Sequence, residues 1–222
     1  MTRVKFKIIG VHERDDIIAK MKENCPNASV FYDEVRSKNC LARTIKVLKE
    51  SDNNEYTHIA VLCDDLELCN QFEEIVTTMC EVFPNVIFSP YNSRLQYTDR
   101  KTSSPYVRVN GCGVYGQCVI IPVSLIDKFL SWAEKHCPEN YPHDDVAVGE
   151  FAYQTGVPVF ATIPCILQHI EPCNSILKYN SPNKTSKVYN GQIAPSAENW
   201  LDKNYSISKV IRNSKGMVDK LI

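Results

Sequence analysis

The stretch THIAVLCDDLEL, residues 57–68, shows how the first half of the chain is organised. Its apolar run, Ile59 to Leu62, is typical of a buried strand, and it ends in two adjacent acids, Asp64 and Asp65. Two neighbouring carboxylates repel each other, which raises the pKa of one of them unless a cation intervenes. The pair therefore indicates either an exposed turn or a site for a metal ion.

Strands and helices alternate on both sides of this stretch. Helical patterns occupy residues 14–25, 41–51 and 70–83, and strand-like runs occupy residues 4–11, 28–35, 57–64 and 85–91. The short links between them predict parallel strands covered by helices on both faces. We therefore expect an α/β, Rossmann-like fold with a mainly parallel mixed sheet.

In the second half of the chain the strands and helices no longer alternate regularly. A strand is expected at residues 117–122, helices at about 124–136 and 144–156, and a short strand at 158–164. Gly156 is a favourable residue to end the second of these helices. We expect a single domain over residues 1–178, divided near residue 92. Residues 179–222 are expected to form a basic loop and helix packed on that domain.

Composition and charge exclude several classes of protein. Hydrophobic residues make up 44% of the 222 and charged residues 23%, as in ordinary soluble domains. No apolar run approaches the roughly 20 residues that cross a bilayer, so no membrane partner is expected. The formal net charge is −1, but the part from Glu171 to Ile222 carries eight Lys or Arg and four acids. That basic end is either a solvated tail or a contact for a polyanion.

The ten cysteines are scattered along the chain. No Cys-x-x-Cys pair occurs, so the usual zinc signatures are absent from the sequence. The N-terminus, MTRVKFKIIG, has a short apolar run and no small-residue cleavage site, unlike a secretory signal. Free thiols in a reducing cytoplasm are therefore expected.

The two acids fall where a ligand of such a fold would bind. Ligands of open α/β sheets bind at the carboxyl ends of the strands, and Asp64 and Asp65 end a strand. Mg²⁺ and Mn²⁺ prefer carboxylate oxygens and also bridge diphosphates. The pair is therefore suited to a metal that neutralises the diphosphate leaving group of a nucleotide. The alternative, a pair of helix-capping aspartates, stays open at this point.

Two clusters in the second half bear on that choice. YPHDDVAVGEF, residues 141–151, places Asp144 and Asp145 at the start of a helix. An acid there either caps the helix or accepts a proton from an attacking hydroxyl. His169 follows an apolar run, either as a structural residue or as the imidazole ligand that the acid pair lacks.

The stretch VNGCGVYGQCVIIP, residues 109–122, contains three glycines, Gly111, Gly113 and Gly116. Glycine lets backbone approach a ligand closely and adopt a positive φ. The stretch lacks the strand–GxGxxG–helix context of a dinucleotide site, and the chain contains no GxxxxGK(S/T) loop. NAD binding and P-loop nucleotide hydrolysis are therefore not expected.

Taken together, these motifs resemble those of GT-A fold glycosyltransferases, which use nucleotide-sugar donors and a divalent metal. In that family an acidic motif, usually Asp-x-Asp, closes the strand after the first βα units; here LCDDLEL stands in its place, with Cys63 at the first motif position. Small viral and bacterial members, including the N-terminal domain of a chlorella-virus glycosyltransferase, have a similar QDD strand end, a later DD helix start and a PSLVQH segment. HDDVAVGEF and IPCILQHIEPCNSIL stand at the matching places, so the resemblance covers roughly residues 4–178.

The resemblance implies a role for each candidate residue. Asp65 is expected to be the principal ligand of Mn²⁺ or Mg²⁺, with His169 completing the metal site and Asp64 contacting ribose or the donor sugar. Asp145, or Asp144, is expected to be the catalytic base. The other residues expected to lie near the nucleotide-sugar are Arg14, Asp33, Arg43, Gly111 and Gly113.

The expected function is metal-dependent transfer of a sugar from a nucleotide-sugar, by family expectation a UDP-sugar, to an acceptor hydroxyl. Residues 1–92 would bind the nucleotide and residues 93–178 the acceptor. If Asp145 acts as the base, attack is direct and the anomeric centre inverts. A glycan, a protein hydroxyl and a hydroxymethylated base in phage DNA are all compatible acceptors. The basic C-terminal segment favours a polyanion, whereas the acidic body argues against general DNA binding.

Two other classes of protein stay open. A nucleotide-sugar-binding module would keep the fold without turnover. A sugar nucleotidyltransferase shares strand-end acids and a parallel sheet, but GVHERDD, residues 10–16, lacks the glycine-rich basic loop that such an enzyme normally carries. The protein is expected in the cytoplasm, which would be the host's for a phage or viral member.

Overall fold

A computed structural model places helices on both faces of one large sheet and describes residues 1–35, 39–51, 55–91, 104–110, 114–170, 189, 200–212 and 218–221. The helices are η1 (His12–Arg14, a 3₁₀ turn), α1 (Asp15–Asn24), α2 (Cys40–Glu50), α3 (Phe72–Val82), α4 (Val123–His136) and α5 (Asp144–Thr155). The strands are β1 (Val4–Gly10), β2 (Ser29–Tyr32), β3 (His58–Cys63), β4 (Leu66–Leu68), β5 (Ile87–Phe88), β6 (Tyr106–Asn110), β7 (Cys118–Pro122), β8 (Val159–Thr162), β9 (Leu167–His169), β10 (Ser206–Arg212) and β11 (Val218–Leu221).

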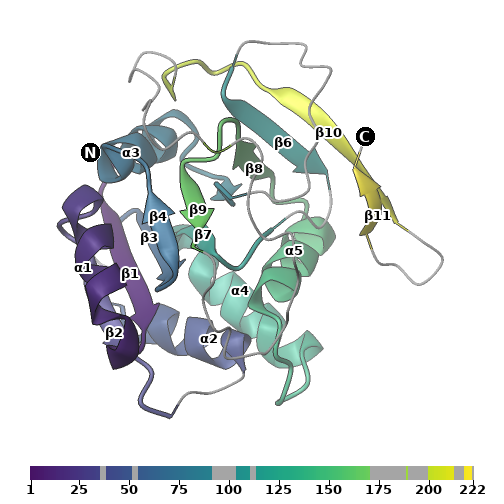
Figure 1. The fold of residues 1–222 in the computed structure, drawn as a ribbon. Coiled ribbons are helices and arrows are strands. Elements are labelled where there is room, and N and C mark those ends of the chain that lie inside the picture. Colours follow the sequence, from purple (N-terminus) through teal and green to yellow (C-terminus); the bar gives the residue numbers. More distant parts are fainter. Residues whose placement is uncertain are drawn as a thin grey trace.

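The nine strands of the main sheet follow the order β11-β10-β6-β8-β5-β7-β3-β1-β2 (Figure 1). Among these described strands four pairings are parallel: β2 with β1, β1 with β3, β5 with β8, and β6 with β10. The other four are antiparallel, including both pairings of β7. The α/β class and the mixed sheet are confirmed. The three-stranded parallel unit, β2-β1-β3, is the part that the βαβ alternation predicted.

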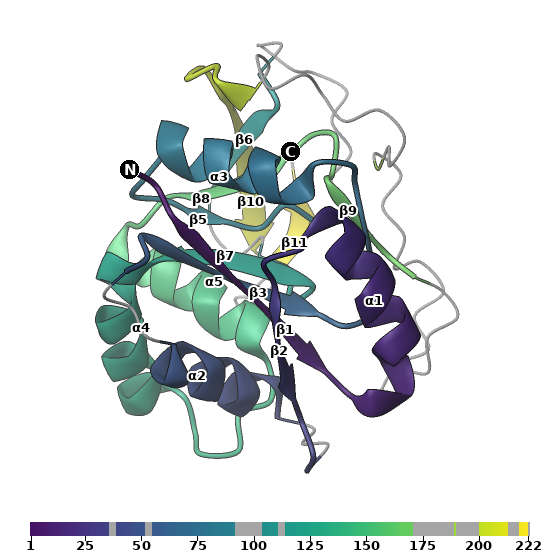
Figure 2. The same cartoon turned by 90° about the vertical axis from the view of Figure 1, so that its left-hand side faces the viewer.

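Alternation along β3 explains why the sheet is covered on both faces. Ala60 and Leu62 pack in one core with α1 and α3, whereas Ile59 and Val61 pack in another with α2, α4 and α5. Successive side chains of a strand point to opposite faces, so an uninterrupted apolar strand needs helices on both. Figure 2 shows α3 on one side of the sheet and α2, α4 and α5 on the other.

Local signals mark the boundaries of three helices. The Asn39 side chain accepts the N–H of Ala42 at 2.9 Å and caps the start of α2. α3 ends at Val82, just before Pro84. Gly156 follows α5 with φ 75°, the left-handed conformation that favours glycine.

The expected C-terminal helix is not found at residues 206–212 and 218–221, which form strands instead. The described part of that segment forms β10 and β11, and β10 pairs in parallel with β6 of the main sheet. The stretch SISKVIR, residues 206–212, is rich in β-branched residues, which favour strands. Its partner lies about a hundred residues away in the sequence, so local patterns did not indicate the pairing. The C-terminal segment therefore extends the sheet instead of packing on it.

Two expectations from composition can be compared with the structure. The eight cysteines in the described part of the chain are free thiols, and burial raises the pKa of Cys25, Cys80 and Cys118. These thiols therefore fill core volume and are not reactive. Among the described residues, no helix combines the length and apolar character needed to cross a membrane.

A buried histidine at the start of β3 is expected to make stability depend on pH. His58 is 1% exposed, its Nε2 lies 3.1 Å from the Pro84 carbonyl oxygen, and burial lowers its pKa from 6.5 to about 4. Between these values the unfolded chain binds the extra proton, so stability is lost as the pH falls from about 6.5 to about 4. We expect a loss of up to about 3 kcal/mol, measured by urea unfolding.

The comparison with His58→Gln isolates this histidine from other groups that titrate in the same range. The difference in unfolding free energy between wild type and this variant should change across pH 6.5 to 4. His136→Gln, at an exposed position on α4, serves as the matched control. A constant difference between wild type and His58→Gln over that range would contradict the prediction.

Candidate functional site

The candidate site lies at the carboxyl ends of β1, β2 and β3. The helix after β1 packs on one face of the sheet and the helix after β2 on the other, so the strand order reverses here. In open α/β sheets the crevice at such a switch point is the usual ligand site. The segments that follow these three strands carry Arg14, Asp33, Asp64 and Asp65.

Asp64 is anchored to the end of β1. It is 6% exposed, its Oδ2 accepts the N–H of Val11 at 2.9 Å, and its Oδ1 accepts a charged hydrogen bond from Arg14. It also packs over Gly10, where a Cβ would lie 2.7 Å from Ile18 Cδ1 and 3.5 Å from Asp64 Cβ. Burial raises the pKa of Asp64 in spite of Arg14 and the Val11 N–H. The carboxylate is therefore a fixed part of the strand end.

Asp65 lies between a guanidinium and an imidazole. Its Oδ2 is 3.2 Å from Arg14 Nη1 and 3.2 Å from His169 Nε2. Burial by itself would raise the pKa of Asp65, but His169 and Arg14 outweigh it and lower the pKa. The environments of the two acids thus push their pKa values apart. Within the chain, Arg14 is the cation that intervenes between them.

A small two-stranded sheet brings His169 to Asp65. β4 and β9 pair antiparallel with Leu66 opposite His169, and the Ile170 N–H donates to the carbonyl oxygen of Asp65 at 2.9 Å. Because Leu66 directly follows Asp65, this register places the imidazole beside the carboxylate. His169 is 6% exposed, and its Nδ1 has no hydrogen-bond partner among the residues that the structure describes.

The pair of Asp65 and His169 fits a divalent cation. Neighbouring ligands of an octahedral Mg²⁺, each about 2.1 Å from the ion, lie about 3 Å apart. Asp65 Oδ2 and His169 Nε2 are 3.2 Å apart, and a carboxylate with an imidazole also suits Mn²⁺. In the described ranges no group of three or more acidic, thiol or imidazole side chains forms a closed metal cage. The remaining ligands would be phosphate oxygens and water, as is usual for Mg²⁺.

Asp33 and Arg43 form an ion pair at the end of β2. Asp33 Oδ2 lies 3.3 Å from Arg43 Nη1, and the Asp33 N–H donates to the Gly10 carbonyl oxygen at 2.9 Å. Arg43 Nη2 also donates to Cys40 Sγ at 3.1 Å, while its Nε is buried with no partner in the described part of the chain. Through Gly10 this ion pair adjoins the strand end that holds Asp64.

The two acids at the start of α5 lie in different environments. Asp144 Oδ2 accepts the Thr44 hydroxyl at 2.9 Å, and its Oδ1 accepts the N–H of Asp145 at 2.9 Å. Burial, and after it the charge of Asp145, raises the pKa of Asp144 to about 6. Asp145 Oδ1 instead accepts the N–H of Val146 at 2.8 Å, within the first turn of its own helix. Asp144 is therefore the acid held across the junction of α2 and α5.

Gly116 connects Asp144 to the end of β3. A Cβ at Gly116 would lie 2.9 Å from Asp144 Oδ1, and its carbonyl oxygen accepts the Cys63 thiol at 3.2 Å. Burial is the main cause that raises the pKa of Cys63 well above its usual value, and the negative charges of the nearby acids add to it. In this structure the protonated Cys63 thiol acts as a hydrogen-bond donor to Gly116.

The structure thus places eight of the ten candidate residues; Gly111 and Gly113 lie outside the described residues. Arg14, Asp64, Asp65 and His169 form one contact cluster, and Asp33 with Arg43 and Asp144 with Asp145 lie at its margins. Sequence reasoning missed Thr44, which is 2% exposed. The available signal was its place on the buried stripe of a helix, between Leu41 and Val47, because a buried hydroxyl needs a partner.

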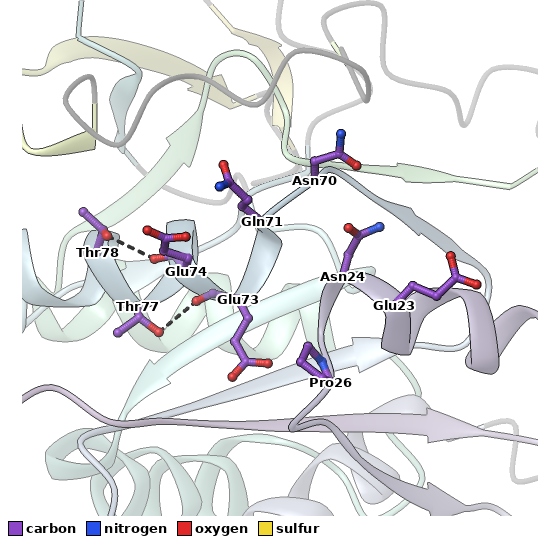
Figure 3. Close-up of a pocket in the computed structure, with 9 residues that line it drawn as sticks. All are labelled: Glu23, Asn24, Pro26, Asn70, Gln71, Glu73, Glu74, Thr77 and Thr78. Carbon is purple, nitrogen blue, oxygen red and sulfur yellow. Dashed lines mark hydrogen bonds between the residues drawn. The ribbon is translucent and has the colours of Figure 1, made fainter.

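A separate hollow of about 640 Å³ lies between the end of α1 and the start of α3 (Figure 3). None of the candidate residues lines it. Its lining residues are Glu23, Asn24, Pro26, Asn70, Gln71, Glu73, Glu74, Thr77 and Thr78. Three carboxylates and no cation among these residues make it unsuited to a diphosphate.

Comparisons with known proteins find structural similarity without sequence similarity. No family model matches the chain, and no curated protein matches it. A crystal structure of a glycosyltransferase involved in the glycosylation of the major capsid of PBCV-1 aligns over 80% of this chain and 100% of its own, with 10% identity and a TM-score of 0.47. The protein A197 from STIV aligns over 77% of this chain and 86% of its own, with 16% identity and a TM-score of 0.37.

Proposed function

We propose that the protein is a metal-dependent glycosyltransferase that moves a sugar from a nucleotide-sugar to an acceptor hydroxyl. The observation that carries the proposal is the pair of Asp65 and His169, 3.2 Å apart at the switch point of the sheet. A partly open metal site at this position is what a nucleoside diphosphate leaving group requires. A separate carboxylate, at the start of α5, is available for the acceptor side.

The excess of negative charge among the candidate residues favours a bound metal ion. Carboxylates outnumber guanidiniums among the candidate residues; the carboxylates are Asp33, Asp64, Asp65, Asp144 and Asp145, and the guanidiniums are Arg14 and Arg43. This excess of negative charge would repel a diphosphate that arrived alone. Asp65 and His169 would hold a divalent cation, which would supply the missing positive charge and Lewis-acid chemistry toward the phosphate oxygens.

The chain's own residues have distinct tasks in this proposal. Arg14 keeps positive charge between Asp64 and Asp65, where the diphosphate would lie. Asp33 and Arg43 flank the nucleoside. A carboxylate of α5 removes the proton of the acceptor hydroxyl as that oxygen attacks the anomeric carbon.

The test is a calorimetric titration of the protein with UDP, with and without Mn²⁺. We expect binding of UDP that requires the metal and disappears on addition of EDTA, because the acidic site repels the bare diphosphate. GDP, CDP and TDP, titrated in the same way, determine which base is accepted. Failure of all four nucleotides to bind in the presence of Mn²⁺ or Mg²⁺ would refute the proposal.

Turnover then separates the transferase from its two alternatives. With UDP-glucose, UDP-galactose or UDP-N-acetylglucosamine and water as acceptor, a transferase releases UDP slowly. A binding module releases nothing, and a sugar nucleotidyltransferase forms or consumes pyrophosphate. Release of UDP that depends on Mn²⁺ is the expected result.

A further inference from the structure

The hydroxyl of Thr44 has a different kind of hydrogen-bond partner from the hydroxyls of Thr77, Thr78 and Thr155. In α3 and α5 the hydroxyls of Thr77, Thr78 and Thr155 donate to the carbonyl oxygen four residues earlier, at 2.8, 3.0 and 2.6 Å. Such a bond is the usual solution for threonine within a helix. Thr44 in α2 instead donates to a carboxylate on another helix, Asp144 Oδ2, at 2.9 Å.

The absence of a side chain at Gly116 leaves room for the same carboxylate. Asp144 Oδ1 lies where a Cβ on Gly116 would be only 2.9 Å away, so any side chain at this position would push the carboxylate out. Gly116 is not among the residues with positive φ, which means that space and not backbone conformation calls for glycine here. The carboxylate therefore lies between α2 and the loop that precedes β7.

We propose that Thr44 and Gly116 are positioning residues that hold Asp144, and not Asp145, as the proton acceptor for the incoming hydroxyl. This inference rests on the proposed function. Asp144 accepts the Thr44 hydroxyl of α2 and lies beside Gly116, whose carbonyl oxygen accepts the thiol of Cys63, the residue just before the acid pair. In the step, the acceptor O–H proton passes to an Asp144 oxygen. A bond forms from that acceptor oxygen to the anomeric carbon, and the anomeric carbon–phosphate oxygen bond breaks with its electron pair leaving on the diphosphate.

The surroundings of Asp144 favour a carboxylate that changes charge in the working range. On its own helix it faces Asp145, on α2 it faces Arg43 and Cys40, and on β3 it faces Cys63. Burial and Asp145 favour the protonated form, while Thr44 and Arg43 favour the ionised form. The balance, a pKa of about 6, suits a general base near neutral pH. Loss of the Thr44 hydroxyl should therefore move this pKa upward.

The test compares Thr44→Val, Thr44→Ser and the control Thr77→Val, which removes a hydroxyl from α3, away from the site. The titration of Asp144, followed by carboxyl ¹³C NMR, should move up by about one pH unit in Thr44→Val, since a hydrogen bond to a charged group is lost. The acid limb of kcat for UDP release should move with it, giving about fivefold to tenfold slower turnover at pH 6 with donor KM unchanged. Thr44→Ser should restore both, and Thr77→Val should alter neither.

Three further variants keep the proposal falsifiable if Thr44→Val folds poorly. Gly116→Ala should lower kcat while Mn²⁺-dependent UDP affinity stays the same, because the alanine methyl displaces only the carboxylate. Asp144→Asn should slow turnover by about a hundredfold to ten thousandfold, and Asp145→Asn should reduce it much less. An unchanged titration and pH profile in Thr44→Val, or the reverse order of the two Asp→Asn variants, would overturn the inference. Failure of the wild type to bind any nucleotide would instead refute the proposed function, while the NMR titration would still report whether Thr44 holds the carboxylate.

Discussion

Asp65→Asn is expected to abolish Mn²⁺-dependent binding of UDP and to slow donor turnover by about a thousandfold or more. The asparagine removes the negatively charged ligand of the proposed metal and leaves His169 without its carboxylate partner. A Lewis-acid metal provides several kcal/mol toward the transition state, and about 4 kcal/mol corresponds to a thousandfold in rate. Titration of Mn²⁺ followed by electron paramagnetic resonance measures the metal directly, without any sugar donor.

Stability is the control for this variant. Asp65 contacts Arg14 and His169, so some loss of folding free energy, about 1–2 kcal/mol, should accompany the substitution. Asp127→Asn, at an exposed position of α4, is the matched variant and should leave metal binding and turnover unchanged. Near-normal Mn²⁺ affinity in a folded Asp65→Asn protein would remove the metal site from the proposal.

Asp144→Asn is expected to have two opposite effects: turnover should fall by about a hundredfold to ten thousandfold, while the fold becomes more stable at pH 7.5. The pKa of Asp144 is raised from 3.8 to about 6. Below pH 3.8 the side chain is protonated in both the folded and the unfolded state. As the pH rises from there through about 6, the unfolded chain loses the proton more readily than the folded protein, so folding stability is lost. At neutral pH the folded protein therefore carries the cost of a charged, largely buried carboxylate.

The size of that cost can be bounded. A rise in the pKa of Asp144 from 3.8 to about 6 corresponds to about 3 kcal/mol of folding free energy. Because Asp144 is partly exposed, we expect the asparagine variant to recover about 1–2 kcal/mol of it. The amide can still accept the N–H of Asp145 and donate to the Thr44 oxygen, so the local contacts survive. Urea unfolding at pH 7.5 and at pH 4 measures the gain, most of which should be absent at the lower pH. An Asp144→Asn protein that is less stable than wild type at pH 7.5 and equally active would contradict both parts of the prediction.

The first half of the molecule could be predicted from the sequence because its signals are local. The apolar run from Ile59 to Leu62 needs cover on both faces, and the structure provides two separate cores for its alternating side chains. The position of Asp64 and Asp65 at a strand end follows from the same pattern, since a strand that ends at Cys63 delivers the next two residues to the edge of the sheet, where α/β folds usually bind ligands.

The tertiary structure alone decided which side chains meet at that edge. The register of β4 with β9 sets His169 beside Asp65, and the packing of α2 against α5 turns Asp144 toward Thr44. It also placed β10 beside β6, where a helix was predicted. Each of these contacts joins segments that are distant in sequence, and their geometry depends on strand register and helix rotation. Periodicity along one segment determines which face is buried but carries no information about the distant segment that covers it. The sequence by itself therefore determined the alternating strands and helices of the first half and the acid pair, and the fold determined their partners.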